Sequence, residues 1–289
     1  MKGLTDNMKK GLPILITAVF GAIVCSVIRF FQYVTILDFE TGFFTRESGF
    51  AGTIIYAALA LFGAAVVFLA IFGFKRGWTA TTAACDGLGS KATLIQGICW
   101  LAAAAVQCIG FINSDGISLI GGIISAVSLA AVGFLLLKNS VPPKAAGLIN
   151  LVPALCLFLR LTRFFSSDII IKSHSESLIL LLGYVFGVLF LASMARFFTG
   201  LETKYARLRE VMTACFTLVL TLTHVIARTL GLICGGESLS GMGGIDPTAA
   251  SLAALSLGWL VTVCCFSQRK SANFISEKTD DTEEKLEKK

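Results

Sequence analysis

The stretch from Gly147 to Ser166 reads GLINLVPALCLFLRLTRFFS and carries charge at only two positions. A helix of this length rises about 30 Å, which matches the thickness of the hydrocarbon layer of a membrane. Its two charged residues, Arg160 and Arg163, are three positions apart and therefore share one face of such a helix. Charge inside a membrane span is costly and is rarely retained without a partner or a function. The stretch therefore predicts a membrane-spanning helix with a polar site near one end.

Similar apolar runs recur along the whole chain of 289 residues, of which 55% are hydrophobic and 15% are charged. A soluble protein would carry about 25% charged residues, and the mean hydropathy of +0.82 is high. The runs are continuous and longer than the alternating ten-residue segments of a membrane β-barrel. We therefore predict an all-α integral membrane protein, a bundle of eight transmembrane helices. The predicted spans are approximately residues 12–37, 50–74, 94–113, 117–137, 147–166, 177–199, 211–233 and 248–266.

The distribution of Lys and Arg predicts the orientation of these spans. If the N-terminus is cytoplasmic, inner segments hold 17 of the 24 basic residues, outer loops hold 2, and 5 arginines lie within spans. Because basic residues favour the cytoplasmic side, both termini are expected to be cytoplasmic. The predicted organisation is a basic head (residues 1–11), an eight-helix transmembrane domain (residues 12–266) and a charged, disordered tail (residues 267–289). The positive charge flanks the spans, so we predict no nucleic-acid partner.

Enzyme and cofactor motifs are missing from the sequence. Seven of the nine cysteines fall inside apolar runs, and no Cys-x-x-Cys occurs, so the cysteines are expected to be small core residues. Two histidines are too few for a His-Glu-x-x-His site. We therefore predict no metal site, no cofactor and no catalytic residue, and we favour a protein that is not an enzyme.

Two short patterns bear on how the helices are arranged. Residues 29–31 and 163–165 both read Arg-Phe-Phe near an outer end, which suggests a weak parallel repeat of two four-helix halves, although a third copy begins at Arg196. Gly183 and Gly187 form the small-residue spacing typical of close helix packing in membranes. Gly121 and Ser125 are expected to play a similar part in their own span.

Four of the five arginines inside the predicted spans lie at outer ends, and no Asp or Glu lies in the core of any predicted span. The span at residues 211–233 has a polar stripe whose members fall within about 80° of one another. These members are Thr213, Thr217, Thr221, His224 and Arg228. Such a stripe must face protein or water, because lipid cannot satisfy its hydrogen bonds.

We therefore expect an outward-facing, arginine-lined cavity between the first, fifth and seventh spans. Its predicted ligand-binding residues are Arg29, Gln32, Tyr33, Arg160, Arg163, His224 and Arg228. The third span is a further candidate wall, with Gln96, Trp100 and Gln107 on one face. The alternative is that the outer arginines only fix the bundle by pairing with nearby acids. The candidate acids are Asp38, Glu40 and Asp168.

The function that this cavity predicts is binding or translocation of a small anionic ligand or an anionic lipid headgroup. Arginine suits this role because its planar guanidinium binds carboxylate and phosphate with two parallel hydrogen bonds. One alternative is a non-catalytic membrane subunit or scaffold that docks a partner protein through the cytoplasmic tail. Another is a membrane enzyme acting on a lipid phosphate, with Asp38 or Asp168 as the base. Membrane lipids are expected partners in every case, and the short loops favour a multi-pass protein of the plasma membrane of a bacterium.

Overall fold

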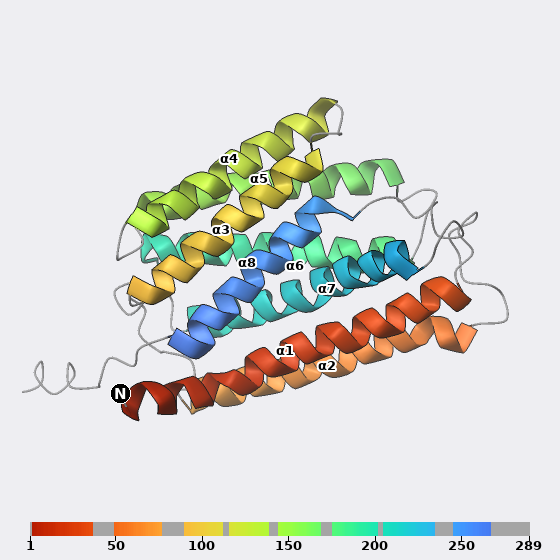
Figure 1. Ribbon diagram of the computed structural model, residues 1–289, viewed down its shortest axis with the longest axis horizontal. Coiled ribbons are helices and arrows are strands. Elements are labelled where there is room, and N and C mark those ends of the chain that lie inside the picture. Colours follow the sequence, from red (N-terminus) through yellow and green to blue (C-terminus); the bar gives the residue numbers. More distant parts are fainter. Residues whose placement is uncertain are drawn as a thin grey trace, which may run out of the picture.

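The computed structural model describes residues 2–36, 49–76, 90–111, 116–138, 144–168, 175–201, 205–234 and 245–266. These residues form helices and no strand. The helices are α1 (Lys2–Thr35), α2 (Gly49–Lys75), α3 (Ser90–Phe111), α4 (Gly116–Lys138), α5 (Lys144–Asp168), α6 (Ser175–Thr199), α7 (Ala206–Cys234) and α8 (Pro247–Val261) (Figure 1). Helix α8 continues into a π-helical turn, η4 (Thr262–Phe266).

Eight helices in the described part of the chain are long and apolar enough to cross a membrane. This confirms the all-α architecture and the eight spans predicted from the sequence. Several helices extend a few residues beyond their predicted spans, and the longest N-terminal extensions are those of α1 and α7: α1 begins at Lys2, so the basic head is helical, and α7 begins at Ala206. The orientation of the bundle and the internal repeat stay predictions.

Helices α3 to α8 form a closed ring in which each helix packs against its neighbours in sequence and α8 packs against α3. Helices α1 and α2 form a pair outside this ring, in contact with α7. Figure 1 shows this pair along one side of the bundle, with α3 and α4 along the opposite side. Helix α8 contacts α3, α6 and α7 and is the most deeply buried of the candidate spans.

Small residues explain how closely some of these helices approach. A Cβ atom added at Gly187 would lie 2.8 Å from Leu252 of α8 and 3.1 Å from Leu157 of α5. A Cβ atom at Gly183 would lie 3.2 Å from Thr221 of α7. Hence the two glycines of α6 let it pack tightly against three helices, as their spacing predicted.

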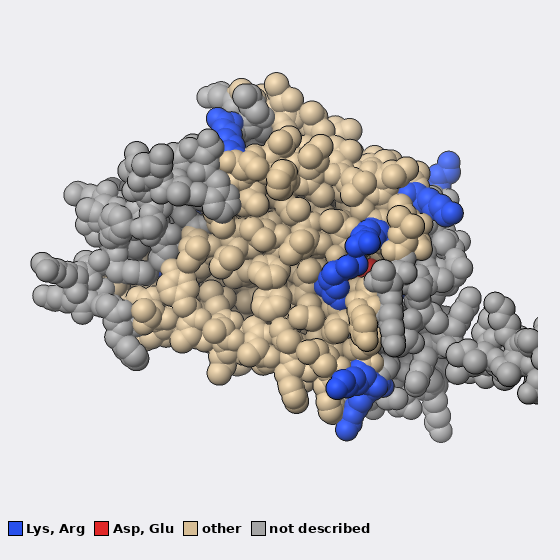
Figure 2. All heavy atoms as spheres, turned by 180° about the vertical axis from the view of Figure 1, so that it is seen from behind, with Lys and Arg blue, Asp and Glu red and all other residues tan. Residues whose placement is uncertain are grey.

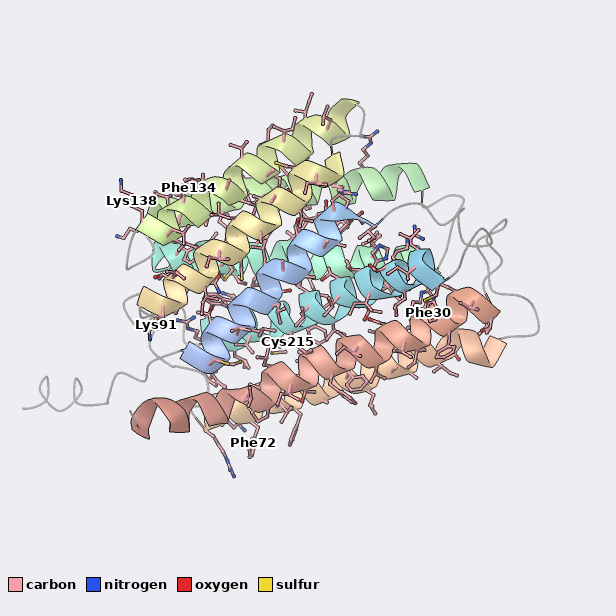
Figure 3. The ribbon with its side chains drawn as sticks, viewed as in Figure 1. Phe30, Phe72, Lys91, Phe134, Lys138 and Cys215 are labelled. Carbon is pink, nitrogen blue, oxygen red and sulfur yellow. The ribbon has the colours of Figure 1, made fainter. Side chains whose placement is uncertain are left out.

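Charged side chains lie toward the ends of the bundle. In Figure 2 most of the Lys and Arg atoms lie toward one end, and a broad band without charged side chains separates them from a smaller group near the other end. Figure 3 places Lys91 and Lys138 at one end and Phe30 at the opposite end. We call the end of Phe30, where α5 ends and α8 begins, the outer end, following the predicted orientation.

Candidate ligand-binding site

Arg160 joins three helices near the outer end. Its Nη2 atom lies 2.8 Å from Oδ2 of Asp246, at the start of α8, and its Nη1 atom donates to Oγ1 of Thr248. Tyr184 of α6 donates its hydroxyl to the same Oδ2 atom of Asp246 at 2.5 Å. The guanidinium of Arg160 also lies 5.3 Å from the centre of the Tyr184 ring. Through these contacts α5, α6 and α8 are held together at one level.

Asp246 has a second role as the N-cap of α8. Its Oδ1 atom accepts hydrogen bonds from the backbone N–H groups of Thr248 at 2.8 Å and Ala249 at 3.3 Å. Pro247 occupies the first helical position, where no N–H donor is required. One carboxylate therefore both starts α8 and neutralises Arg160.

The acid that pairs with Arg160 is thus Asp246, and not one of the acids proposed from the sequence. Asp38 and Glu40 lie outside the described residues. Asp168 is the last residue of α5, and the structure does not describe its side chain. An ion pair that fixes the bundle is nevertheless present at Arg160. This agrees with the alternative in which an outer arginine pairs with a nearby acid, although the acid is a different one.

A pocket of about 300 Å³ lies beside Arg160, between α4, α5 and α8. Its polar lining residues are Gln107, Ser125, Arg160, Arg163, Thr248 and Ser251. All of its other lining residues are Leu, Ile, Pro, Gly or Cys. The pocket is therefore apolar along most of its wall, with two arginines on one side and no Asp or Glu among its lining residues.

The pocket reaches the surface that a membrane protein presents to lipid. Ile120 and Ile124 of α4 and Leu159 of α5 line it, and all three are exposed. A Cβ atom added at Gly121 would meet nothing within 4 Å, although Gly121 lies in the middle of this wall. The expectation that Gly121 marks a close helix contact is therefore wrong, because it faces open space in the pocket.

Gln107 of α3 contributes a polar group that the fold does not use. Its side chain is buried, lines the pocket, and has an Oε1 atom without a hydrogen-bond partner. Gln96, on the same predicted face, donates to Oγ1 of Thr262 at 2.8 Å and accepts from Nε1 of Trp100 at 3.2 Å. Because buried polar groups are nearly always paired, the contrast marks Gln107 as a candidate ligand contact.

The predicted site residues of α1 form a separate cluster. Arg29, Gln32 and Tyr33 are all buried. The Nη1 atom of Arg29 donates to Oε1 of Gln32 at 3.0 Å, and its guanidinium lies 4.9 Å from the centre of the Tyr33 ring. Gln32 in turn donates to the carbonyl oxygen of Gly52 in α2 at 3.4 Å. This cluster therefore links α1 to α2.

The remaining predicted site residues lie on α7, which packs along α1. His224 is buried and Arg228 is half-buried. The hydroxyl of Thr223 donates to the carbonyl oxygen of Ala22 at 3.5 Å, which sets the register of the two helices. Since α1 and α7 are parallel, this register brings Arg228 to nearly the same depth as Arg29.

The threonine stripe of α7 is buried, as expected. Thr213, Thr217 and Thr221 each donate a hydrogen bond to the backbone carbonyl four residues earlier, at 2.9, 2.7 and 2.6 Å respectively. Such bonds satisfy a hydroxyl inside its own helix. The stripe therefore needs no ligand to satisfy its hydroxyl groups.

The structure divides the predicted site residues between two places. Helix α5 packs mainly against α4 and α6, whereas α1 packs against α2, α7 and η4. A single cavity between α1, α5 and α7 is therefore not formed by the described residues. Arg160 and Arg163 border the pocket, while the other five predicted residues belong to the contact of α1 with α2 and α7.

The sequence interpretation missed a buried ion pair at the opposite end of the bundle. Arg207 and Glu210 lie between the predicted spans 177–199 and 211–233, on the side expected to be cytoplasmic, but both are buried in the first turns of α7, with Nη1 and Oε2 3.3 Å apart. The guanidinium lies 4.1 Å from the ring centre of Phe197 and 5.7 Å from that of Trp259. The spacing of three residues between opposite charges was a signal that could have indicated this pair.

Comparison of the chain with protein-family models, curated proteins and solved structures finds no match. Within the described residues, no group of three or more His, Cys, Asp or Glu side chains is placed to hold a metal ion. The functional assignment therefore depends on the geometry and chemistry of the pocket.

Proposed function

We propose that this protein binds or translocates a small anionic ligand or an anionic lipid headgroup at the arginine side of the pocket. The observation that carries the proposal is the pair Arg160 and Arg163 at the edge of an apolar pocket whose lining residues include no acid. In this proposal the protein works as a binding protein or transporter in the plasma membrane of a bacterium. The short loops of the chain support that location.

The two arginines have different parts in the proposed site. Arg160 is positioned by Asp246 and Thr248, so its guanidinium is fixed in place before a ligand arrives. Arg163 is one turn further along α5 and is exposed. A rigid guanidinium beside a second, more accessible one suits a carboxylate or phosphate group, which accepts several hydrogen bonds at once.

The five predicted site residues at the contact of α1 with α2 and α7 receive a different role in this proposal. Arg29 already donates a hydrogen bond to Gln32, and Gln32 donates one to the backbone of α2. We assign Arg29, Gln32, Tyr33, His224 and Arg228 to holding α1 and α2 against the ring of helices. The anion contacts are then Arg160 and Arg163.

Native mass spectrometry of protein gently extracted from its own membrane tests the proposal. Wild type should carry a bound anionic species, and Arg163→Ala should lose it, because Arg160 is already paired with Asp246 and the variant removes the other guanidinium of the site. The matched control is Arg209→Ala, which removes an exposed arginine at the other end of the bundle. Equal retention of the species by Arg163→Ala and Arg209→Ala would overturn the assignment.

A further inference from the structure

We infer that the pocket holds the hydrocarbon chain of an anionic lipid whose headgroup lies at Arg160 and Arg163. The inference rests on the proposed function and deepens it, since it names the ligand class as an amphiphile and not a free anion. Four features of the pocket lead to it: its charge, its length, its opening and one buried amide.

The charged residues of the pocket wall lie toward one end of it, and most of the rest of the wall is apolar. The two arginines lie toward the outer end of α5, and the rest of the wall is formed mostly by apolar side chains such as Leu157, Leu252 and Leu255. A free carboxylate or phosphate gains nothing from such a wall, because burying a charge among apolar groups is costly. A molecule with an anionic head and an apolar chain complements both parts.

The length of the wall corresponds to one leaflet of a bilayer. From Arg163 to Pro153 the lining extends over ten residue steps of α5, which is about 15 Å along a helix axis. The hydrocarbon core of a membrane is about 30 Å thick. A chain lying in the pocket would therefore span about the depth of the outer leaflet while its headgroup stays at the membrane surface.

The opening of the pocket allows such a chain to enter sideways. Ile120, Ile124 and Leu159 line the pocket and are also exposed on the surface of the bundle. Gly121 leaves open space beside them, since no atom other than those of its chain neighbours and of its own helix backbone lies within 4 Å of the position a Cβ would occupy. A lipid in the outer leaflet could therefore move its chain sideways from the bilayer into the pocket without passing it through water.

Gln107 supplies the polar contact between headgroup and chain. It is four residues before the end of α3 at Phe111, so its depth is just below the outer surface. Its buried Oε1 atom has no partner in the fold. Oxygen and nitrogen of an amide are interchangeable by rotation, so this side chain can donate to an ester carbonyl or accept from a hydroxyl. A phospholipid carries ester carbonyl groups where its chains join the headgroup.

The experiment measures the melting temperature of the purified full-length protein in mixed micelles with increasing amounts of three probes. The probes are phosphatidylglycerol, which is anionic and has chains, phosphatidylcholine, which has chains without net charge, and glycerol phosphate, which is anionic without chains. We expect phosphatidylglycerol to raise the melting temperature and the other two to leave it unchanged, because a ligand that binds the folded state stabilises it.

Two variants test the pocket, each with a matched control. Gln107→Leu should weaken the response to phosphatidylglycerol about tenfold while leaving the melting temperature without lipid unchanged or higher, since an unpaired buried group is removed. Gly121→Phe should abolish the response by filling the pocket. The controls Gln96→Leu, which breaks two internal hydrogen bonds, and Ile123→Phe, which changes an exposed residue of α4 outside the pocket wall, should keep it.

Each other outcome decides against the inference. An equal response to glycerol phosphate would show that a free anion suffices, which overturns the lipid inference and leaves the proposed anion binding intact. An equal response to phosphatidylcholine would show that charge is not recognised, which overturns both. Retention of the phosphatidylglycerol response by Gln107→Leu and Gly121→Phe would place the lipid elsewhere and overturn the inference.

Discussion

Two arginine–carboxylate pairs, one at each end of the bundle, differ mainly in what surrounds them. In the pair Arg160–Asp246 the side chains are 36% and 14% exposed, and the arginine borders a pocket. In the pair Arg207–Glu210 they are 9% and 2% exposed, and aromatic rings of Phe197 and Trp259 lie next to the guanidinium. The same chemical pair is thus open to a ligand in one place and enclosed in the other.

In our proposal this difference separates a binding role from a structural role. An enclosed pair has lost most of its hydration. Its contribution to stability therefore depends on both charges being present, because either one alone would be buried without a partner. A partly exposed pair contributes less to stability, because solvent screens it, but it can offer part of a positioned guanidinium to a ligand. Burial of the pair, more than the presence of arginine, is therefore the feature by which we place the proposed site at the outer end.

The largest expected effect comes from breaking the enclosed pair. Glu210→Leu leaves Arg207 buried without its carboxylate and should lower the free energy of unfolding by about 3–5 kcal/mol. Unfolding of the purified protein by sodium dodecyl sulfate in mixed micelles, followed by circular dichroism, measures this change. The double variant Arg207→Met/Glu210→Leu is the control and should recover most of the loss, because no unpaired charge is left. A Glu210→Leu protein as stable as wild type would show that the pair is effectively hydrated.

A smaller effect is expected at the open pair, and two variants of Asp246 separate its two roles. Asp246→Asn keeps an oxygen to cap α8 but loses the charge facing Arg160, and should cost about 1 kcal/mol after allowance for exposure. Asp246→Ala also loses the cap and should cost about 1 kcal/mol more. The same unfolding measurement compares them. Equal stability of the two variants would contradict the capping role of Asp246.

The sequence was sufficient to predict the helices, because each span is a continuous apolar run with turn residues or charges at its ends. Asp246 and Pro247, for example, directly precede the predicted span at residues 248–266 and prove to be the N-cap and the first residue of α8. The sequence was not sufficient to predict which helices are neighbours. The outer arginines of α1, α5 and α7 share a depth, but contacts between side chains of distant spans decide that α5 lies beside α4 and α6.

The third helix shows why the site itself was only partly predictable. Gln96 and Gln107 share a face by spacing, yet one is paired with Thr262 and the other faces the pocket. That outcome depends on where η4 and α4 lie against α3, which the spacing within one helix does not encode. Likewise Gly121 and Gly187 each lie four residues from another small residue, which predicts close helix packing for both. Only Gly187 is in close contact with neighbouring helices.

The measurement that tests the central claim most directly is a crystal structure of the protein purified from its own membrane with its native lipids retained. We expect elongated electron density in the pocket between α4, α5 and α8, with its polar end beside Arg160 and Arg163 and a polar atom within hydrogen-bonding distance of Gln107. A pocket that is closed by side chains or filled with ordered water, with the lipid density elsewhere on the bundle, would contradict the account.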